Sequence, residues 1–372
     1  MIARVDRTGT AERLRAVLDE VVQAPGTQSV LLLAADGNGW TAAAVDGVVQ
    51  AVPVPLFGGV FPELLYGREQ LRRGFIVAGL TDRAEVQVIP RLSDPGADYE
   101  RVIDDERVRP DTRTMLVFVD GLARRVSALV EALFNVFGLQ FNYIGGGAGS
   151  LSFERKPCLF TNGGLVQDAA VLATLATSSG VGVSHGWTNV AGPFQVTESD
   201  RNVIQSLDWR PALDVYRAVV EAHSGRPLLV EDFFEHAKSY PFGIIKLGSE
   251  TVVRDPLMVD GAGGLVCVGE VPQGTYVRVL TGDVHSLVDA AGRALLLGTE
   301  SYPGEAGPHT TLFIDCISRA LFLGEQFGRE LEAVYRPHTT LLGALTLGEI
   351  ANSRRDYLEF YNKTSVVGVL DA

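Results

Sequence analysis

Apolar positions along the chain alternate between helical and strand-like spacings. Between Ala11 and Gln23 they recur every three or four residues, which is typical of an amphipathic helix. Residues 29–35 and 114–119 are apolar runs of the length of buried strands, and the second run leads into a helical pattern that ends at Gly138. This mixture of strands and helices predicts an α+β fold.

Turn-forming residues divide the chain into two parts. Asn162-Gly163, between two apolar runs, predicts a β-hairpin, and the Gly and Pro within residues 223–227 predict a linker. We therefore expect two modules, 28–222 and 223–367, each a mixed, largely antiparallel β-sheet with packed helices.

The second module is predicted to contain two long helices and several closing strands. The helices cover residues 283–297 and 316–334, and strands are expected near residues 344–347 and 366–370. The sequence shows no repeat of fixed period that would predict a solenoid or a propeller.

The charge balance and the cysteine content restrict partners and location. The 372 residues include 32 Lys and Arg against 45 Asp and Glu, a net charge of −13. Nucleic acids and anionic membranes require a basic surface, so we exclude both as main partners. The first residues are charged where a signal peptide is apolar, and no run of about 18 uncharged apolar residues predicts a membrane span. With three isolated cysteines and no CxxC pair, the sequence predicts a cytoplasmic protein.

Glycine accounts for 41 residues, and its densest run is Gly145 to Gly149. The spacing within this run, and the residues after it, do not fit a dinucleotide-binding fingerprint or a P-loop. Two interpretations remain open. The run is a turn or close approach between strands, or its backbone at Gly146 and Gly147 forms a cradle for an anionic or planar ligand.

His185 lies in a different setting from the other histidines. Gly182 to Gly186 matches the G-x-S-x-G pattern of hydrolases, but the residues that follow Trp187 cannot form the helix that this mechanism requires. The histidines have no metal-site spacing. His185, however, is next to Trp187, whose indole can stack on a ligand, and one axial imidazole is sufficient to hold haem. His185 is therefore either a candidate haem ligand or a structural residue.

A set of polar residues in the last part of the chain suits a small zwitterion. The set comprises Arg319, Glu349, Asn362 and Thr364. Arg319 would bind the carboxylate of an amino-acid-like ligand and Glu349 its ammonium group. The alternative is an internal Arg319–Glu349 ion pair. Cys316, three residues before Arg319, either belongs to this site or is an activated thiolate at the start of a helix.

The order of the motifs along the chain resembles that of FIST-domain proteins over residues 28–367. In the first half, the resemblance rests on Leu56 to Pro62, Gly145 to Ser150, Phe160 to Gly164, His185 to Trp187, Gly192-Pro193 and Leu207 to Ala212. In the second half, it rests on Tyr240 to Gly243, Arg254 to Pro256, Gly263 to Leu265, Cys316 to Arg319, Leu347 to Ile350 and Phe360 to Thr364.

The resemblance implies a cytoplasmic sensory module that binds a small ligand in signal transduction, amino acids being the usual suggestion. A stand-alone FIST subgroup is similar to haem-binding nitric-oxide sensors that regulate a separate histidine kinase. Because no kinase, cyclase or chemotaxis segment flanks residues 28–367, we expect output through a partner protein such as the histidine kinase of a two-component system. Three hypotheses follow: a non-enzymatic sensor of a small polar ligand, a haem-based nitric-oxide sensor, and an enzyme that uses Cys316.

Overall fold

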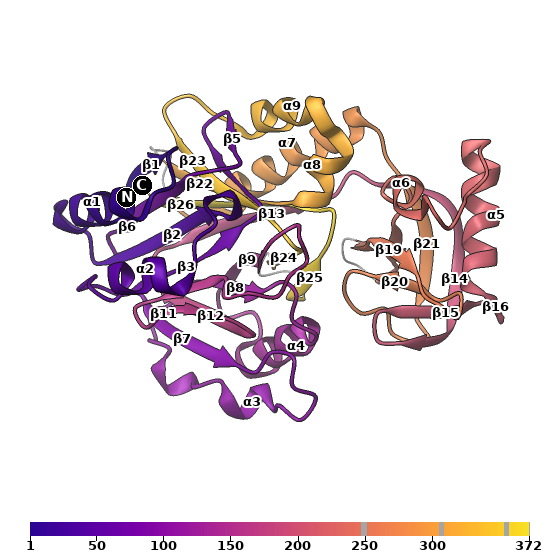
Figure 1. Cartoon of the computed structure of the whole chain (residues 1–372), viewed down its shortest axis with the longest axis horizontal. Helices are drawn as coiled ribbons and strands as arrows, with labels where there is room; N and C mark the ends of the chain where they lie inside the picture. The colour runs from indigo at the N-terminus through magenta and orange to yellow at the C-terminus, as the bar shows by residue number, and fades with distance from the viewer. Residues whose placement is uncertain (247–250, 305–308, 353–356, 372) are drawn as a thin grey trace.

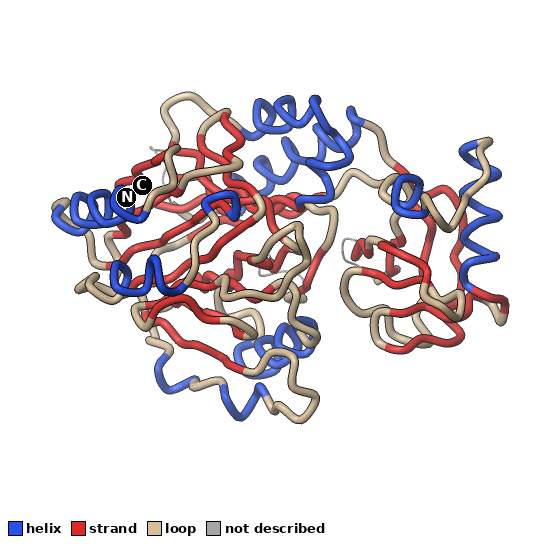
Figure 2. Tube along the Cα trace, in the orientation of Figure 1, coloured by secondary structure: helices blue, strands red, loops and turns tan. Residues whose placement is uncertain are grey.

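The computed structural model of the chain describes residues 1–246, 251–304, 309–352 and 357–371. It shows helices and strands along the whole described chain (Figure 2). The strands form mixed sheets in which antiparallel pairs prevail, so the predicted α+β class is confirmed. Within these ranges, no helix is both long and apolar enough to cross a membrane.

The molecule has two lobes (Figure 1). The large lobe comprises the described residues of 1–187 and 282–371, and the small lobe comprises those of 188–281. The chain enters and leaves the small lobe at one place, because Thr188 lies opposite Thr281 in two paired strands. The small lobe is therefore inserted into the large one.

In the described part of the chain, the large lobe is built on three sheets of six strands, whose residues are mostly apolar and buried. The first sheet has the order β1 (Ile2–Asp6), β6 (Phe75–Leu80), β2 (Ser29–Ala35), β3 (Leu56–Phe61), β10 (Leu159–Thr161), β11 (Gly164–Val166). The second has the order β25 (Glu359–Tyr361), β24 (Glu349–Ala351), β9 (Asn142–Ala148), β8 (Thr114–Asp120), β12 (Ala169–Leu175), β7 (Glu85–Pro90). The third has the order β13 (Ser179–Ser184), β26 (Ser365–Asp371), β22 (His309–Cys316), β23 (Thr340–Thr346), β4 (Glu63–Tyr66), β5 (Glu69–Leu71).

Helices pack on each of these sheets (Figure 1). They form because apolar residues share one helical face, as in the first helix, which buries Leu14, Val17 and Val21 and is capped by Thr10. The first sheet carries α1 (Ala11–Gln23) and α2 (Ala42–Val49), with the short η1 (Asp36–Asn38). The second carries α3 (Tyr99–Val102), η2 (Asp105–Arg107) and α4 (Val126–Phe137). The third carries α7 (Val284–Ser301), α8 (Ile317–Leu323), η3 (Gly324–Gln326) and α9 (Phe327–Val334).

The three sheets repeat one arrangement of strands. In each, a parallel pair (β2–β3, β8–β9 or β22–β23) is flanked by an antiparallel strand (β6, β12 or β26) and then by an edge strand (β1, β7 or β13). The hairpin that follows each parallel pair joins a different sheet: β4–β5 pairs with β23, β10–β11 with β3, and β24–β25 with β9. The large lobe thus consists of three equivalent repeats that exchange hairpins in a ring. The sequence, which shows no fixed period, did not predict this repetition.

Equivalent positions in the repeats carry equivalent residues. A β-carbon added to Gly58, Gly145 or Gly343 would lie 1.9, 1.8 or 1.8 Å from a carbonyl oxygen of the neighbouring parallel strand, so each strand pair requires glycine there. Leucines repeat in the same way around a small cavity of about 20 Å³, which is lined by Leu31, Leu80, Leu116, Leu175, Leu312 and Leu370.

The small lobe is built on one sheet with helices beside it. The strand order is β18 (Val252–Arg254), β17 (Phe242–Ile244), β21 (Tyr276–Thr281), β14 (Thr188–Asp200), β15 (Val203–Leu207), β20 (Leu265–Cys267), β19 (Pro256–Val259), with β16 (Arg210–Pro211) paired to β15. The helices are α5 (Ala212–Ser224) and α6 (Phe233–Ala237). The ring of Tyr216 on α5 packs 5.2 Å from that of Phe242, which joins the helix to the sheet.

Several predicted elements are confirmed, including the strand at 29–35 and the hairpin at Asn162-Gly163. The predicted helix 316–334 is wrong as a single element. Gly324 has a φ of +53°, which no α-helical residue adopts, and it separates α8 from α9. The predicted boundary near residue 222 falls inside α5, and the two module limits stay a prediction.

Candidate functional site

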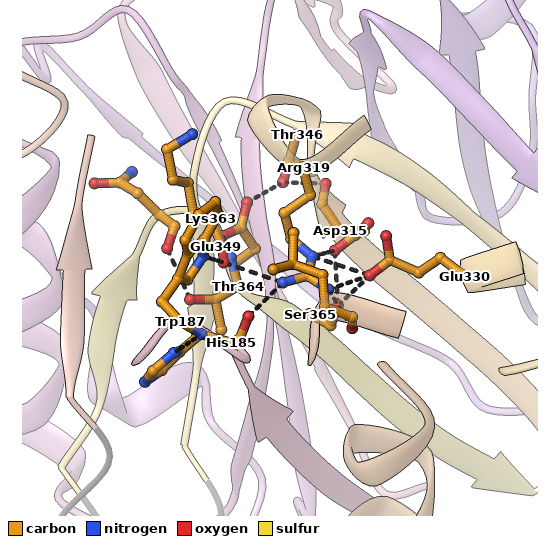
Figure 3. Close-up of polar contacts among 12 residues, drawn as sticks. His185, Trp187, Asp315, Arg319, Glu330, Thr346, Glu349, Lys363, Thr364 and Ser365 are labelled. Atoms are coloured by element: carbon orange, nitrogen blue, oxygen red, sulfur yellow. Dashed lines mark hydrogen bonds and ion pairs between the residues drawn. The ribbon is translucent and has the colours of Figure 1, made fainter. Parts of the chain in front are cut away.

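Arg319 is the centre of a fully buried polar cluster (Figure 3). Its Nε lies 3.0 Å from Glu330 Oε1 and 3.1 Å from Asp315 Oδ1. The Ser365 hydroxyl lies within hydrogen-bond distance of the same two oxygens, at 3.2 Å and 2.9 Å. Burial raises the pKa of Asp315 and of Glu330, and Arg319 opposes this effect in both. One guanidinium therefore stabilises two buried carboxylates.

The remaining Arg319 donors bind backbone carbonyls. Nη1 donates to the oxygens of His185 at 2.6 Å and Lys363 at 3.3 Å, and Nη2 donates to that of Leu287 at 2.9 Å. Nη2 also contacts Glu330. Each of the five guanidinium N–H groups can thus be assigned an acceptor within the chain, which leaves none for the carboxylate of a ligand.

Glu349 does not contribute to this ion pair among the described residues. It begins β24, where its Oε1 accepts a hydrogen bond from the Thr346 hydroxyl at 2.9 Å and its Oε2 one from the Thr364 N–H at 3.3 Å. Burial, assisted by Asp315, raises the pKa of Glu349 well above its usual range, which favours the neutral acid. The carboxylates that bind Arg319 are instead Asp315 and Glu330.

His185 and Trp187 are packed against the same cluster (Figure 3). The Trp187 N–H donates to His185 Nδ1 at 2.9 Å, its indole N–H donates to the Lys363 carbonyl at 3.0 Å, and its ring lies 5.2 Å from that of Phe322. His185 is 8% exposed, and burial together with Arg319 lowers its pKa to about 4. A porphyrin needs an open slot beside its axial imidazole. These packed side chains do not fit a haem at His185.

Gly146 and Gly147 allow a close approach of two backbone segments. A β-carbon on Gly147 would lie 2.4 Å from the Leu347 carbonyl oxygen, and one on Gly146 would lie 2.6 Å from that of Gly348. The Gly147 N–H donates to the Gly348 carbonyl at 2.8 Å. Of the two interpretations of this glycine run, the geometry favours the close approach between strands.

A cavity of about 220 Å³ lies between the two lobes. The large lobe contributes the residues that follow β8 and β9, the start of α8, and Asn362. The small lobe contributes Phe234, Asp255 and Leu257, as well as the end of β20. A second cavity, of about 530 Å³, adjoins the first, because Leu122 and Asn202 line both. The interface between the lobes therefore contains two adjoining cavities.

Asn362 and Asp255 bring unpaired polar atoms to the first cavity. Asn362 is 1% exposed, and neither its amide oxygen nor its amide nitrogen has a hydrogen-bond partner in the described structure. Asp255 is fully buried, and its Oδ1 also has no partner there. Buried polar groups are nearly always paired, and an unpaired one costs about 1–3 kcal/mol. Two such groups at one cavity indicate a place where another molecule completes the hydrogen bonding.

Lys363 and Ser318 hold the other side of Asp255. Asp255 Oδ2 accepts a hydrogen bond from the Ser318 hydroxyl at 2.7 Å and lies 3.3 Å from the Lys363 ammonium. The buried Lys363 also donates to the Lys238 carbonyl at 2.9 Å and lies 5.2 Å above the Trp187 ring. Burial raises the pKa of Asp255, and Lys363 and Ser318 oppose this effect. A buried ion pair thus joins the lobes beside the cavity.

The structure divides the predicted ligand residues into two groups. Cys316 and Asn362 line the cavity. Arg319, Glu349 and Thr364 lie in the buried hydrogen-bond network already described and are not among the residues that line it. His185, Trp187, Gly146 and Gly147 are likewise absent from its lining.

Cys316 has the opposite properties to those of an activated thiolate. It is 3% exposed, and burial, together with the nearby Glu349, raises the pKa of its thiol well above the usual value. A free arginine three residues on would stabilise a thiolate, but the positive charge of Arg319 is already offset by Asp315 and Glu330. The Cys316 environment gives no support to a nucleophilic role.

Sequence reasoning missed Asp255, Ser318 and Lys363. A signal was present, since Asp255 and Lys363 fall within two of the motifs that carry the family resemblance. A lysine between Asn362 and Thr364, in a segment of otherwise uncharged residues, indicates a buried cation that needs a carboxylate partner. Neither motif reveals which carboxylate that is.

Two family models match adjacent parts of the chain. The FIST N domain matches residues 28–210, and the FIST C domain matches residues 212–352. No curated protein matches the chain. The junction of the two matches lies at the start of α5, so each matched segment contains part of both lobes.

Proposed function

The chain belongs to the FIST family, and on this premise we propose that it binds a small polar molecule in the cavity between its lobes. FIST domains are small-ligand-binding sensory domains of signal transduction. The proposal gives this role a location, lined by Asn362, Asp255 and Ser318.

Asn362 is the observation that carries the proposal. Its amide is 1% exposed and its two polar atoms are unpaired, at a cavity whose walls come from both lobes. A ligand that pairs with Asn362 on the large lobe and with Asp255 on the small lobe would hold the lobes together. Binding would then alter the relation between the lobes, as a sensory protein requires.

The stability of the ligand-free protein tests this reading of Asn362. Asn362→Leu keeps the side-chain size and removes the unpaired amide, so we expect the free energy of unfolding to rise by about 1 kcal/mol or more. Asn352→Leu is the matched control, because Asn352 is equally buried and its amide nitrogen is also unpaired among the described residues, but its Oδ1 accepts the Tyr143 N–H at 2.9 Å. We expect that control to be destabilised.

A thermal-shift screen tests binding directly. The full chain and Asn362→Leu are each heated with a panel of polar metabolites that includes the amino acids, nucleobases and carboxamides. Binding to the native state raises the midpoint by mass action, with about 2.7 kcal/mol of stabilisation at 100 times Kd. We expect at least one compound to raise the midpoint of the wild type and not that of the variant. A panel in which every compound shifts both proteins alike, or neither, contradicts the proposal.

The proposal extends to a cytoplasmic protein whose output passes through a separate signalling protein, such as a histidine kinase. This part is supported by the role of the family in signal transduction. Haem sensing at His185 is not proposed, since Trp187 and the Arg319 cluster pack around that imidazole. A cysteine-dependent enzyme is not proposed either, since burial favours the neutral thiol of Cys316.

A further inference from the structure

We propose that the ligand is an uncharged molecule with a carboxamide-like head and an apolar tail. This inference rests on the proposed function and adds the chemistry of the ligand. The head would pair with Asn362 and Asp255, and the tail would lie over apolar side chains at the opening of the cavity.

The requirement for an amide-like head comes from Asn362. Its amide offers one acceptor and two donors, and a ligand group with an adjacent C=O and N–H satisfies both sides at once. If the oxygen and nitrogen positions of the Asn362 amide are interchanged, the requirement is the same, because the ligand group can bind in the reversed orientation. A second N–H on the same head would donate to Asp255 Oδ1, the other unpaired atom at the cavity. A primary carboxamide provides all of these groups.

The charges around the cavity disfavour an anionic head. No Lys, Arg or His is among the described residues that line it. Two buried cations nearby are already paired: Arg319 with Asp315 and Glu330, and Lys363 with Asp255. A ligand carboxylate would therefore be buried without a counter-ion, which carries a large desolvation cost. The carboxylate of a zwitterionic amino acid would have the same desolvation cost.

Apolar residues at the opening indicate the tail. Phe153 is 58% exposed and Leu321 is 45% exposed, and both line the cavity together with Leu151 and the half-buried Phe234 and Leu257. Asn362, by contrast, is 1% exposed. The cavity therefore offers a buried amide together with exposed apolar side chains. An apolar tail would remove the exposed faces of Phe153 and Leu321 from water, which favours binding in proportion to the area covered.

Isothermal titration of the full chain with matched probes tests the head. The probes are phenylacetamide, phenylacetate, phenethylamine and L-phenylalanine, which share an aromatic tail, and acetamide, which has none. We expect phenylacetamide to bind and the three charged probes to bind about tenfold more weakly or not at all, because a site built for hydrogen bonds rejects a head that leaves them unpaired. Acetamide should bind about tenfold more weakly than phenylacetamide, because its affinity lacks the contribution of the tail.

Variants show whether the binding is at this site. Asn362→Leu and Asn362→Ala should each abolish phenylacetamide binding, and either one suffices if the other fails to fold. Leu321→Glu should weaken phenylacetamide and leave acetamide unchanged. Leu296→Glu is its matched control, because Leu296 is 56% exposed on α7 and does not line the cavity. We expect that variant to bind as the wild type does.

The outcomes separate this inference from the proposed function. If L-phenylalanine or phenylacetate binds most tightly, and Asn362→Leu abolishes that binding, the cavity is a ligand site but the uncharged head is wrong. If no probe binds, the head assignment is wrong and the metabolite screen decides the proposed function. If phenylacetamide binds the Asn362 variants and the wild type equally, both proposals fail.

Discussion

Replacing Arg319 with leucine should destabilise the protein severely, although Arg319 is not among the residues that line the ligand cavity. The side chain is fully buried and contacts both Asp315 and Glu330, which have no other cation in contact with them in the described structure. Removing one partner of a buried ion pair costs about 3–5 kcal/mol, because a charge is left uncompensated. Such a loss is a large fraction of the roughly 5–15 kcal/mol by which a domain is stable.

The pH dependence of this loss follows from the two carboxyl groups. Their usual pKa values are 3.8 for Asp and 4.5 for Glu, and burial raises both in the folded protein. Without Arg319 they rise further, so the folded variant binds more protons than the unfolded chain above about pH 4. The stability of the variant relative to the wild type should therefore decrease as the pH rises. We expect a smaller difference at about pH 5 than at about pH 8.

The assay is urea unfolding of the full chain, followed by far-UV circular dichroism and tryptophan fluorescence. Arg319→Lys keeps the charge but loses the forked geometry, and we expect an intermediate loss. Arg329→Leu is the control, because Arg329 is an exposed arginine on α9, and its effect should lie within about 0.5 kcal/mol. If Arg319→Leu unfolds at the same urea concentration as the Arg329→Leu control and loses only ligand binding, Arg319 is a ligand residue and the reasoning above is refuted.

Three further predictions concern other residues of the same region. In an NMR titration, the His185 imidazole should stay neutral down to about pH 5, because its pKa is lowered from the usual 6.5 to about 4. The stability of the protein should fall as the pH decreases from about 6.5 to about 4. Titration of the imidazole near pH 6.5 would instead show an exposed ring. Cys316 should react with iodoacetamide only after unfolding, because burial raises the pKa of its thiol. Peptide mass spectrometry measures the labelling, and fast labelling of the native protein would support the activated thiolate instead. Gly147→Ala should lose about 1–3 kcal/mol in urea unfolding, because its β-carbon would lie 2.4 Å from the Leu347 carbonyl oxygen. Gly328→Ala, in open helix, should be neutral or stabilised by up to about 1 kcal/mol, and equal effects of the two changes would contradict the packing argument.

Local patterns in the sequence were sufficient for many elements. The strand at 29–35 and the turn at Asn162-Gly163 depend on neighbouring residues, and both are confirmed. Gly324 was overlooked because one glycine in a helical pattern is often tolerated, and only its positive φ shows that the helix ends there. Local pattern therefore predicts which elements exist better than where they stop.

The site depended on contacts that local patterns do not encode. One of the two interpretations paired Arg319 with Glu349, but the structure pairs it with Glu330, which lies beyond the break between α8 and α9. Asp315 was visible in the sequence at the i,i+4 spacing of a helical pair, although it lies on the strand before the helix. Asn362 was predicted as a ligand residue for its chemistry, and it lines a cavity whose other wall is the inserted lobe.

The exchange of hairpins among the three repeats affects how the chain can be synthesised. Strand β4 ends at Tyr66, but its partner β23 begins at Thr340. At about 5–20 residues per second, the ribosome needs roughly 15–55 s to make the chain between them. Over that time the edge of β4 that pairs with β23 is unpaired. The edge of β9 that pairs with β24 is likewise unpaired until β24 has been synthesised. Unpaired edges promote aggregation, so the nascent protein depends on protection until its last repeat emerges. A fragment that ends between the two family matches would never close the ring.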